Sequence, residues 1–209
     1  MSFISKIFGA KRRNLANKKT EQDVQRQLKP LGDIGMAIVQ GSQKCSQGMK
    51  QMFKVPEGLD KSSPQNYPEI WVFYEFLYFF MHMTMRLASR RLREGQIQQL
   101  QNFLGPLLSS TAVDSFCRHW PDERKAKLRS EFYTNLNAAE IEYSKAKEFI
   151  SKDPSMSGEA SCSILARNVA EASGNKMTPP VLIAVIRSVT DAYAEMNLDK
   201  LMIEAGKVL

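Results

Sequence analysis

Three ionisable side chains lie in register within one strongly apolar stretch of this 209-residue sequence. Glu75, His82 and Arg86 are separated by seven and four residues, a spacing that places them along one line of an α-helix. Most residues around them are aromatic or aliphatic, so each of the three groups needs a partner or access to water. An acid, an imidazole and a guanidinium on one line could form a structural network or the polar side of a ligand pocket.

This line of side chains admits three interpretations. In a structural network, Arg86 pairs with a carboxylate from another helix, and His82 donates to Glu75 or to a carbonyl group. In a ligand pocket, aromatic side chains form the walls, and Arg86 or His82 binds an anionic head group. In the third interpretation the three groups lie at an open edge and face water. A role for His82 as general base requires a substrate and an orienting partner, and the sequence identifies neither.

The helix that carries these side chains is predicted over residues 68–93. Pro68 suits a first helical turn, and Gly95 follows the end of the pattern. The segment is apolar on nearly every side, which favours a central position with other helices packed around it. It is too short for a membrane span, because only about 16 residues are mostly apolar where about 20 are needed, and Glu75 and His82 lie among them.

Apolar residues recur with helical spacing along most of the chain, and we find no alternating strand pattern, hairpin signal or internal repeat. The predicted fold class is all-α, an irregular bundle of six or seven helices around the central hydrophobic helix at about 68–93. Residues 31–209 are expected to form this single domain. The predicted elements are a helix over 31–52, a linker over 54–66, a helix over 96–104 closed by Gly105-Pro106, a helix over 107–120 capped by Ser110 or Thr111, helices over 122–150 and 159–172, a last helix opening at Thr178-Pro179-Pro180, and residues 198–209 as its extension or as a separate turn.

The helix predicted over 31–52 has glycines in its interior, and each of these disfavours a helix by about 1 kcal/mol relative to alanine. Gly41, Cys45 and Gly48 share one face of that helix. Small residues on a shared face allow another backbone to approach closely. We therefore expect a second helix to pack tightly against this face.

Residues 1–30 form a basic amphipathic segment that differs from the rest of the chain. Large apolar side chains lie on one helical face, and a run of Lys and Arg follows with no acidic residue before Glu21. This pattern is typical of a weak anchor at an anionic membrane surface. A frayed tail, docking on the domain and, less favoured, nucleic-acid binding are the alternatives. The candidate contacts with a membrane or an acidic partner are Phe3, Ile4, Ile7, Phe8, Lys11, Arg12, Arg13, Lys18 and Lys19.

The formal net charge of +7 is concentrated at this end of the chain. Residues 1–54 carry 11 basic and 3 acidic side chains, whereas residues 96–209 carry 13 and 14. An electrostatic partner is therefore expected at the N-terminal segment and not over the whole surface.

Motifs for several kinds of chemistry are missing from the sequence. It has no P-loop, no Gly-x-Gly-x-x-Gly after a strand, no His-Glu-x-x-His and no Gly-x-Ser-x-Gly. Cys45, Cys117 and Cys162 have neither metal-binding nor redox spacing, which favours a reducing compartment. We therefore expect no metal, no cofactor and no catalytic residues.

Together these patterns favour a cytoplasmic, non-enzymatic helical binding or adaptor protein, with its basic N-terminal segment directed to a membrane surface or an acidic partner. The alternative is a helical bundle with an internal pocket for an apolar or anionic ligand, and such a bundle could also be an enzyme. Glu75, His82 and Arg86 are the candidate ligand-binding residues in that case. A cavity that reaches all three would favour the pocket, whereas a closed core with Arg86 paired would favour the adaptor.

Overall fold

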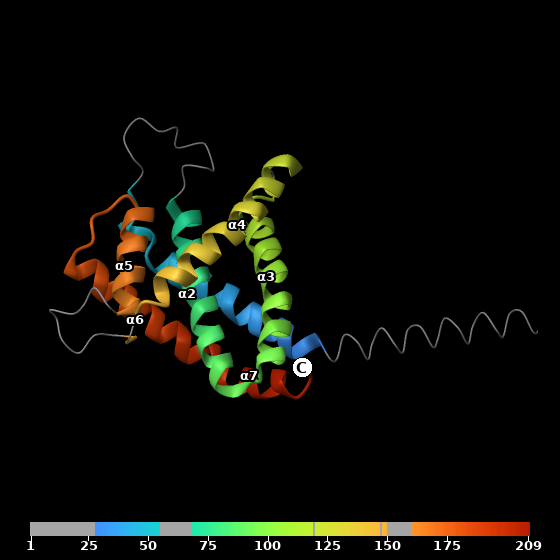
Figure 1. Ribbon diagram of the computed structural model, residues 1–209. Helices are drawn as coiled ribbons and strands as arrows, with labels where there is room; N and C mark the ends of the chain where they lie inside the picture. Colours follow the sequence, from blue (N-terminus) through green and yellow to red (C-terminus); the bar gives the residue numbers. More distant parts are fainter. Residues whose placement is uncertain (1–27, 55–67, 119, 147, 150–159) are drawn as a thin grey trace, which may run out of the picture.

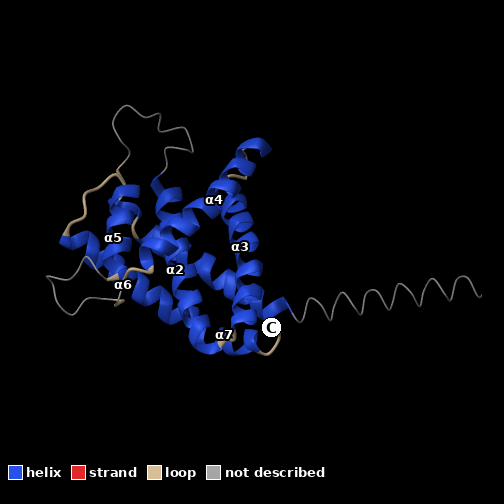
Figure 2. Ribbon diagram, in the orientation of Figure 1, coloured by secondary structure: helices blue, strands red, loops and turns tan. Residues whose placement is uncertain are grey.

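A computed structural model of the chain is built from helices, as Figure 2 shows. The nine candidate contact residues of the basic segment lie outside the part of the chain that the structure describes. The described residues are 28–54, 68–118, 120–146, 148–149 and 160–209.

The predicted all-α fold class is confirmed for these residues. Apart from an isolated β-bridge between Glu148 and Ala160, they form helices, turns and loops. The number of α-helices in the described chain, seven, agrees with the expected six or seven. They are a helix over residues 28–48, α2 (Pro68–Arg91), α3 (Glu94–Phe116), α4 (Asp122–Tyr143), α5 (Ser161–Ala172), α6 (Pro179–Met196) and α7 (Leu198–Gly206), with a short 3-10 helix, η1 (Lys50–Met52), after the first.

Helix α2 runs through the middle of the molecule and contacts α3, α4, α5 and α7 (Figure 1). Phe73, Phe76, Phe79 and Phe80 are fully buried on it. These rings point in several directions around the helix axis, so neighbouring helices on different sides bury apolar area against α2. That burial explains why the most apolar segment of the sequence became the core helix.

The helix over residues 28–48 packs closely against α6, as its small residues predicted. A methyl group added at Gly41 would lie 2.8 Å from the sulfur of Met196 in α6. Cys45 Sγ lies 3.3 Å from the carbonyl oxygen of Ser188, also in α6. Close approach between the two helices therefore compensates for the poor helix propensity of glycine.

Helix α3 differs from the prediction, because it continues through Gly105-Pro106 without a break. The expected end at residue 104 and the expected cap at Ser110 or Thr111 are therefore wrong. Proline removes a backbone donor and disfavours a helix interior. Leu104 and Leu108 are nonetheless fully buried on either side of it, and their burial in the core outweighs the local preference.

Helix α4 ends at Tyr143, seven residues before the predicted end at Ile150. The chain after it turns back to the start of α5. There the carbonyl oxygens of Glu148 and Phe149 accept hydrogen bonds from the amides of Ser161 and Cys162, at 2.9 and 3.1 Å. These amides have no partner inside their own helix, so the segment after α4 acts as a cap that a helical continuation could not provide.

Residues Leu198–Gly206 form a separate helix, α7, so they do not extend α6 as one alternative predicted, and they form more than the separate turn of the other. Asn197 between the two helices has a left-handed backbone, with φ of 48°. Such a conformation ends an α-helix and redirects the chain.

Among the helices of the described residues, none combines the length and the apolar character that a membrane span requires.

Candidate functional site

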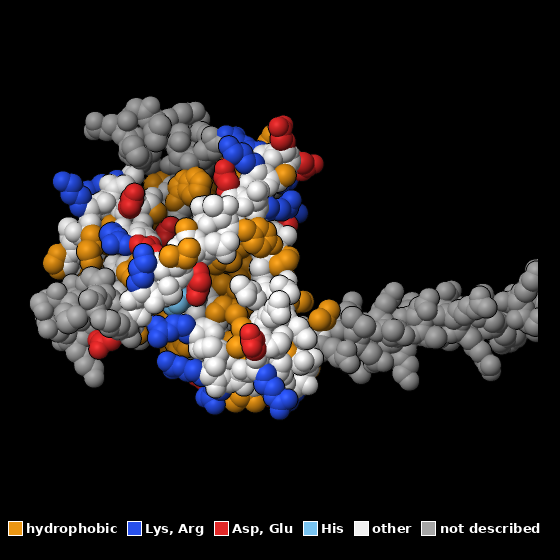
Figure 3. All heavy atoms as spheres, viewed as in Figure 1, with side chains coloured by type: hydrophobic (Ala, Val, Ile, Leu, Met, Phe, Trp, Pro, Cys, Tyr) orange, Lys and Arg blue, Asp and Glu red, His pale blue; other side chains and the backbone are white. Residues whose placement is uncertain are grey.

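A surface groove of about 530 Å³ lies where α2, α4 and α5 meet. Figure 3 shows hydrophobic side chains gathered on the face that α4 crosses, with acidic and basic side chains beside them. The size of the groove falls in the range of sites for small ligands and single side chains. It is lined by Trp71, Tyr74, Glu75 and Tyr78 of α2, by Asn135, Ala138, Ala139, Ile141 and Glu142 of α4, by Lys145 just beyond α4, and by Asn168 of α5.

The aromatic wall of the groove comes from successive turns of α2. The rings of Tyr74 and Tyr78 are stacked with centroids 5.9 Å apart, and Trp71 lies 6.3 Å from Tyr74. A spacing of three and four residues brings such rings onto one helical face. Tyr74 and Tyr78 are buried, whereas Trp71 is 40% exposed at the rim. The groove therefore combines a firmly packed wall with an accessible indole.

Glu75 is the unusual polar residue of this groove. Burial raises the pKa of its carboxyl group to about 7, and the negative charges of Glu142 and Glu171 add to the increase, while a hydrogen bond with Asn168 opposes it. No basic side chain of the described residues pairs with Glu75. Near neutral pH the groove therefore holds a carboxyl group that is about half ionised and lacks a counterion.

The second carboxylate of the groove, Glu142, is already compensated. Its Oε2 accepts a hydrogen bond from Asn168 at 2.9 Å, and its Oε1 forms an ion pair with Arg167 of α5. Lys145 borders the groove and is exposed to solvent. Positive charge therefore lies close to Glu142, and none of it reaches Glu75.

The three side chains predicted on one line of the central helix do lie on α2, but they do not share one cavity. Glu75 lines the groove, whereas His82 is buried beyond it, with Nδ1 2.9 Å from Glu140 Oε2 and its ring 5.4 Å from that of Tyr143. Arg86 is half-buried, and within the described chain it has no ion pair. Seven and eleven residues of helix rise separate the last two from Glu75, about 10 and 16 Å.

The contacts observed differ from those expected of a structural network. His82 pairs with a carboxylate from α4 and not with Glu75, and the partner expected for Arg86 is missing among the described residues. The second ring nitrogen of His82 is buried without a hydrogen-bond partner among the described residues. Helix spacing correctly placed the side chains on a common line, but only the crossing position of α4 determines their partners.

The sequence did not identify Trp71, Tyr78, Asn135, Glu142 and Asn168 as members of a site. The aromatic residues could have been found, because Trp71, Tyr74 and Tyr78 repeat at helical spacing beside Glu75. The asparagines and Glu142 carry no such signal. They belong to other helices and reach the groove only through tertiary packing.

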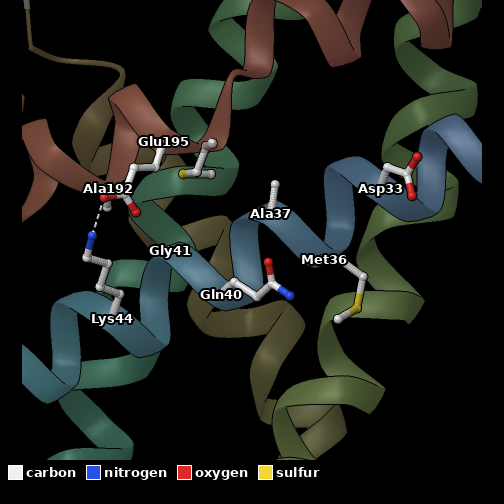
Figure 4. A pocket seen from close by; sticks show the side chains of 9 residues that line it. Asp33, Met36, Ala37, Gln40, Gly41, Lys44, Ala192 and Glu195 are labelled. Atoms are coloured by element: carbon white, nitrogen blue, oxygen red, sulfur yellow. Dashed lines mark hydrogen bonds and ion pairs between the residues drawn. The ribbon is translucent and has the colours of Figure 1, made fainter.

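Another groove lies between the helix over 28–48 and α6, with a volume of about 500 Å³. Figure 4 shows Lys44 and Glu195 pointing toward one another across it, and they form an ion pair. Asp33, at its other end, pairs with Lys29 at 3.1 Å. Both acids in this groove have counterions, so it offers a ligand less uncompensated charge than the α2–α4–α5 groove does.

Neither metal chemistry nor thiol chemistry gains support from the described residues. They contain no group of three or more His, Cys, Asp or Glu side chains arranged to hold a metal ion. Cys45, Cys117 and Cys162 are buried as free thiols. Burial raises the pKa of Cys45 and of Cys162 to about 12, so both remain protonated and unreactive at neutral pH.

Comparison with protein-family models, with curated proteins and with solved structures finds no match to this chain.

Proposed function

We propose that the chain is a non-enzymatic helical binding protein, and that the α2–α4–α5 groove receives a short segment of a partner protein. The observation that carries this proposal is the exposed apolar rim of a groove with a polar interior. Ile141 is 63% exposed and Trp71 is 40% exposed, and both border the groove. Large apolar side chains beside placed polar groups are typical of interaction sites.

A protein segment suits this groove better than an enclosed small molecule does. The exposed amide side chain of Asn135 can exchange hydrogen bonds with a peptide backbone, and the rim residues can cover the apolar side chains of the peptide. An anionic ligand, one of the alternatives raised by the sequence, would meet Glu75 and Glu142 directly. Like charge at a partly buried position opposes such a ligand.

The test is selection of binding peptides from a random displayed library against the full chain. Ala138 is exposed and lines the groove, so Ala138→Tyr should fill it without disturbing the core. Asn137→Tyr is the matched control, because Asn137 is exposed on the same helix outside the lining residues. We expect peptides that bind the wild type and the Asn137 variant, and that lose about tenfold or more in affinity on the Ala138 variant. Peptides that bind all three proteins equally, or an empty selection, would contradict the proposal.

The basic segment over residues 1–30 supplies a second contact in the same proposal. Its apolar face and cations suit an anionic membrane surface or an acidic partner, and the chain would then work in the cytoplasm, peripheral to the inner face of a membrane. Support comes from the concentration of positive charge in the first 54 residues.

A further inference from the structure

The unpaired carboxyl group of Glu75 determines what chemistry the occupant of the groove should have. A carboxyl group that is half-buried beside aromatic side chains loses hydration, and its hydrogen bond with Asn168 supplies no positive charge to compensate for its own charge. Within the described chain the nearby positive charges do not compensate for it either, since Arg167 pairs with Glu142 and Lys145 is directed to solvent. The groove therefore has a vacant position for one positive charge beside Glu75.

We propose that the partner segment inserts an arginine side chain beside Glu75, against the aromatic wall formed by Trp71, Tyr74 and Tyr78. This inference rests on the proposed function and specifies the ligand class of the same groove.

Guanidinium chemistry fits the groove better than an ammonium group does. A guanidinium is planar, stacks on aromatic faces and donates two parallel hydrogen bonds to one carboxylate. Trp71, 40% exposed at the rim, offers such a face near Glu75, and the buried rings of Tyr74 and Tyr78, stacked on each other, form the wall behind it. An ammonium group is a compact, strongly hydrated charge and loses more hydration in the same position.

The charged groups around Glu75 determine how strongly an arginine should bind. Glu142 of α4 and Glu171 of α5 add negative potential, whereas Lys145 after α4 and Arg167 of α5 subtract from it. Tyr74 and Tyr78 remain neutral because burial raises the pKa of both phenols far above neutrality. Lys145 is the basic group that lines the groove without an ion pair among the described residues, so Lys145→Gln should strengthen arginine binding.

Arginine binding should also be linked to proton release. The bound guanidinium favours the ionised form of Glu75, so binding at pH 7 releases part of a proton. The affinity should rise by about tenfold between pH 6 and pH 8, because the ionised fraction of a group with a pKa of about 7 rises by that factor. Glu75→Gln should remove this dependence.

The experiment uses N-acetyl-arginine methylamide and its neutral citrulline counterpart as probes on the full chain. Trp71 and Trp120 are the two tryptophans of the sequence, so Trp120→Phe makes the fluorescence report on the groove. We expect the arginine probe to bind about tenfold more tightly than the citrulline probe, and Glu75→Gln to abolish this difference. Glu171→Gln is the matched control: it removes an exposed acid outside the lining residues and should change the preference by less than about twofold.

The outcomes separate this inference from the proposed function. Equal binding of the two probes, or an arginine preference that survives Glu75→Gln, would overturn the inference. If neither probe binds while library peptides bind through the groove, the groove is a peptide site and the arginine assignment is wrong. If neither probe nor any peptide binds, both proposals fail.

Discussion

At the scale of single residues, burial without a counterion is the property that distinguishes Glu75 from the other acids of the described chain. Most of those acids form exposed ion pairs, such as Lys29 with Asp33 and Arg91 with Asp199. Exposed pairs contribute little to stability and tolerate the loss of a partner. Glu75 instead costs stability whenever it is ionised, so it makes the folded state sensitive to pH.

The first prediction follows from this cost. The pKa of Glu75 is raised in the folded state to about 7, above its value in the unfolded chain. The folded protein therefore holds the proton more tightly, and the stability it contributes is present at low pH and lost as pH rises through about 7. Glu75→Gln should stabilise the protein at pH 8 by on the order of 1–3 kcal/mol relative to wild type, and by much less at pH 5. Urea unfolding at the two pH values measures this, and an equal difference at both would contradict it.

A second prediction compares the other two residues of the line. His82 is 2% exposed, packs against Tyr143 and bonds to Glu140, so His82→Ala leaves a cavity and should cost about 2–4 kcal/mol. Arg86 is half-buried and has no ion pair within the described chain, so Arg86→Ala should cost less than about 1 kcal/mol. Chemical denaturation of both variants tests the order. A greater loss for Arg86 would indicate a buried charge network that involves this side chain.

At the scale of elements, α3 shows tertiary packing overriding a local signal. Gly105-Pro106 is a sound reason to end a helix, yet α3 passes through it, because α3 must extend along both α2 and α4. Position 105 also has little free space on one side, because a methyl group added there would lie 3.3 Å from the ring of Tyr133 in α4. The glycine and the proline are thus accommodated by packing, at a local cost that should be measurable.

The third prediction measures that cost. Pro106→Ala restores a backbone donor within α3 and should stabilise the protein by about 1–3 kcal/mol. Pro179→Ala is the matched control, because Pro179 opens α6, where a proline lacks no helical hydrogen bond and its fixed φ is favourable. The control should be neutral or destabilising by less than about 1 kcal/mol. Thermal and urea unfolding distinguish the two cases, and a destabilised Pro106→Ala would show that the ring itself contributes packing.

At the scale of the whole molecule, elements far apart in sequence are joined at specific backbone contacts. The amide of Lys54, after η1, donates to the carbonyl oxygen of Ser173 at 2.9 Å. The side-chain amide of Asn175 donates to the backbone carbonyl oxygen of Met52 at 2.5 Å. Gly174 lies between Ser173 and Asn175, and its backbone has a φ of 72°. The end of the first helical segment is thereby fixed to the end of α5.

The fourth prediction tests this junction. A methyl group at Gly174 would lie 2.6 Å from the carbonyl oxygen of Lys54, and the positive φ is unfavourable for any residue with a side chain. Gly174→Ala should therefore destabilise the protein by about 2 kcal/mol or more. Gly32→Ala is the matched control, because an added methyl group there has no neighbour within 4 Å, and it should be neutral or slightly stabilising. Equal stabilities of the two variants would contradict the assigned role.

The fifth prediction concerns the basic amphipathic segment over residues 1–30. Deletion of residues 2–19 removes six basic and no acidic side chains, and it should abolish sedimentation with anionic vesicles at low salt. The thermal transition should change little, because residues 2–19 lie outside the predicted helical domain over 31–209. Vesicles of neutral lipid are the control for the apolar contribution. Equal binding by the truncated chain would exclude the segment as a membrane contact.

The sequence by itself determined the all-α class and the positions of most helices, because apolar residues at helical spacing bury a core only as packed helices. It also identified Glu75 as an acid on an apolar helix. Only the tertiary structure decided that α4 ends at Tyr143, that α3 continues through Pro106, and that Glu75, His82 and Arg86 have separate environments. Each of these depends on contacts between residues distant in sequence, whose energies exceed local preferences and leave no periodic signal in the chain.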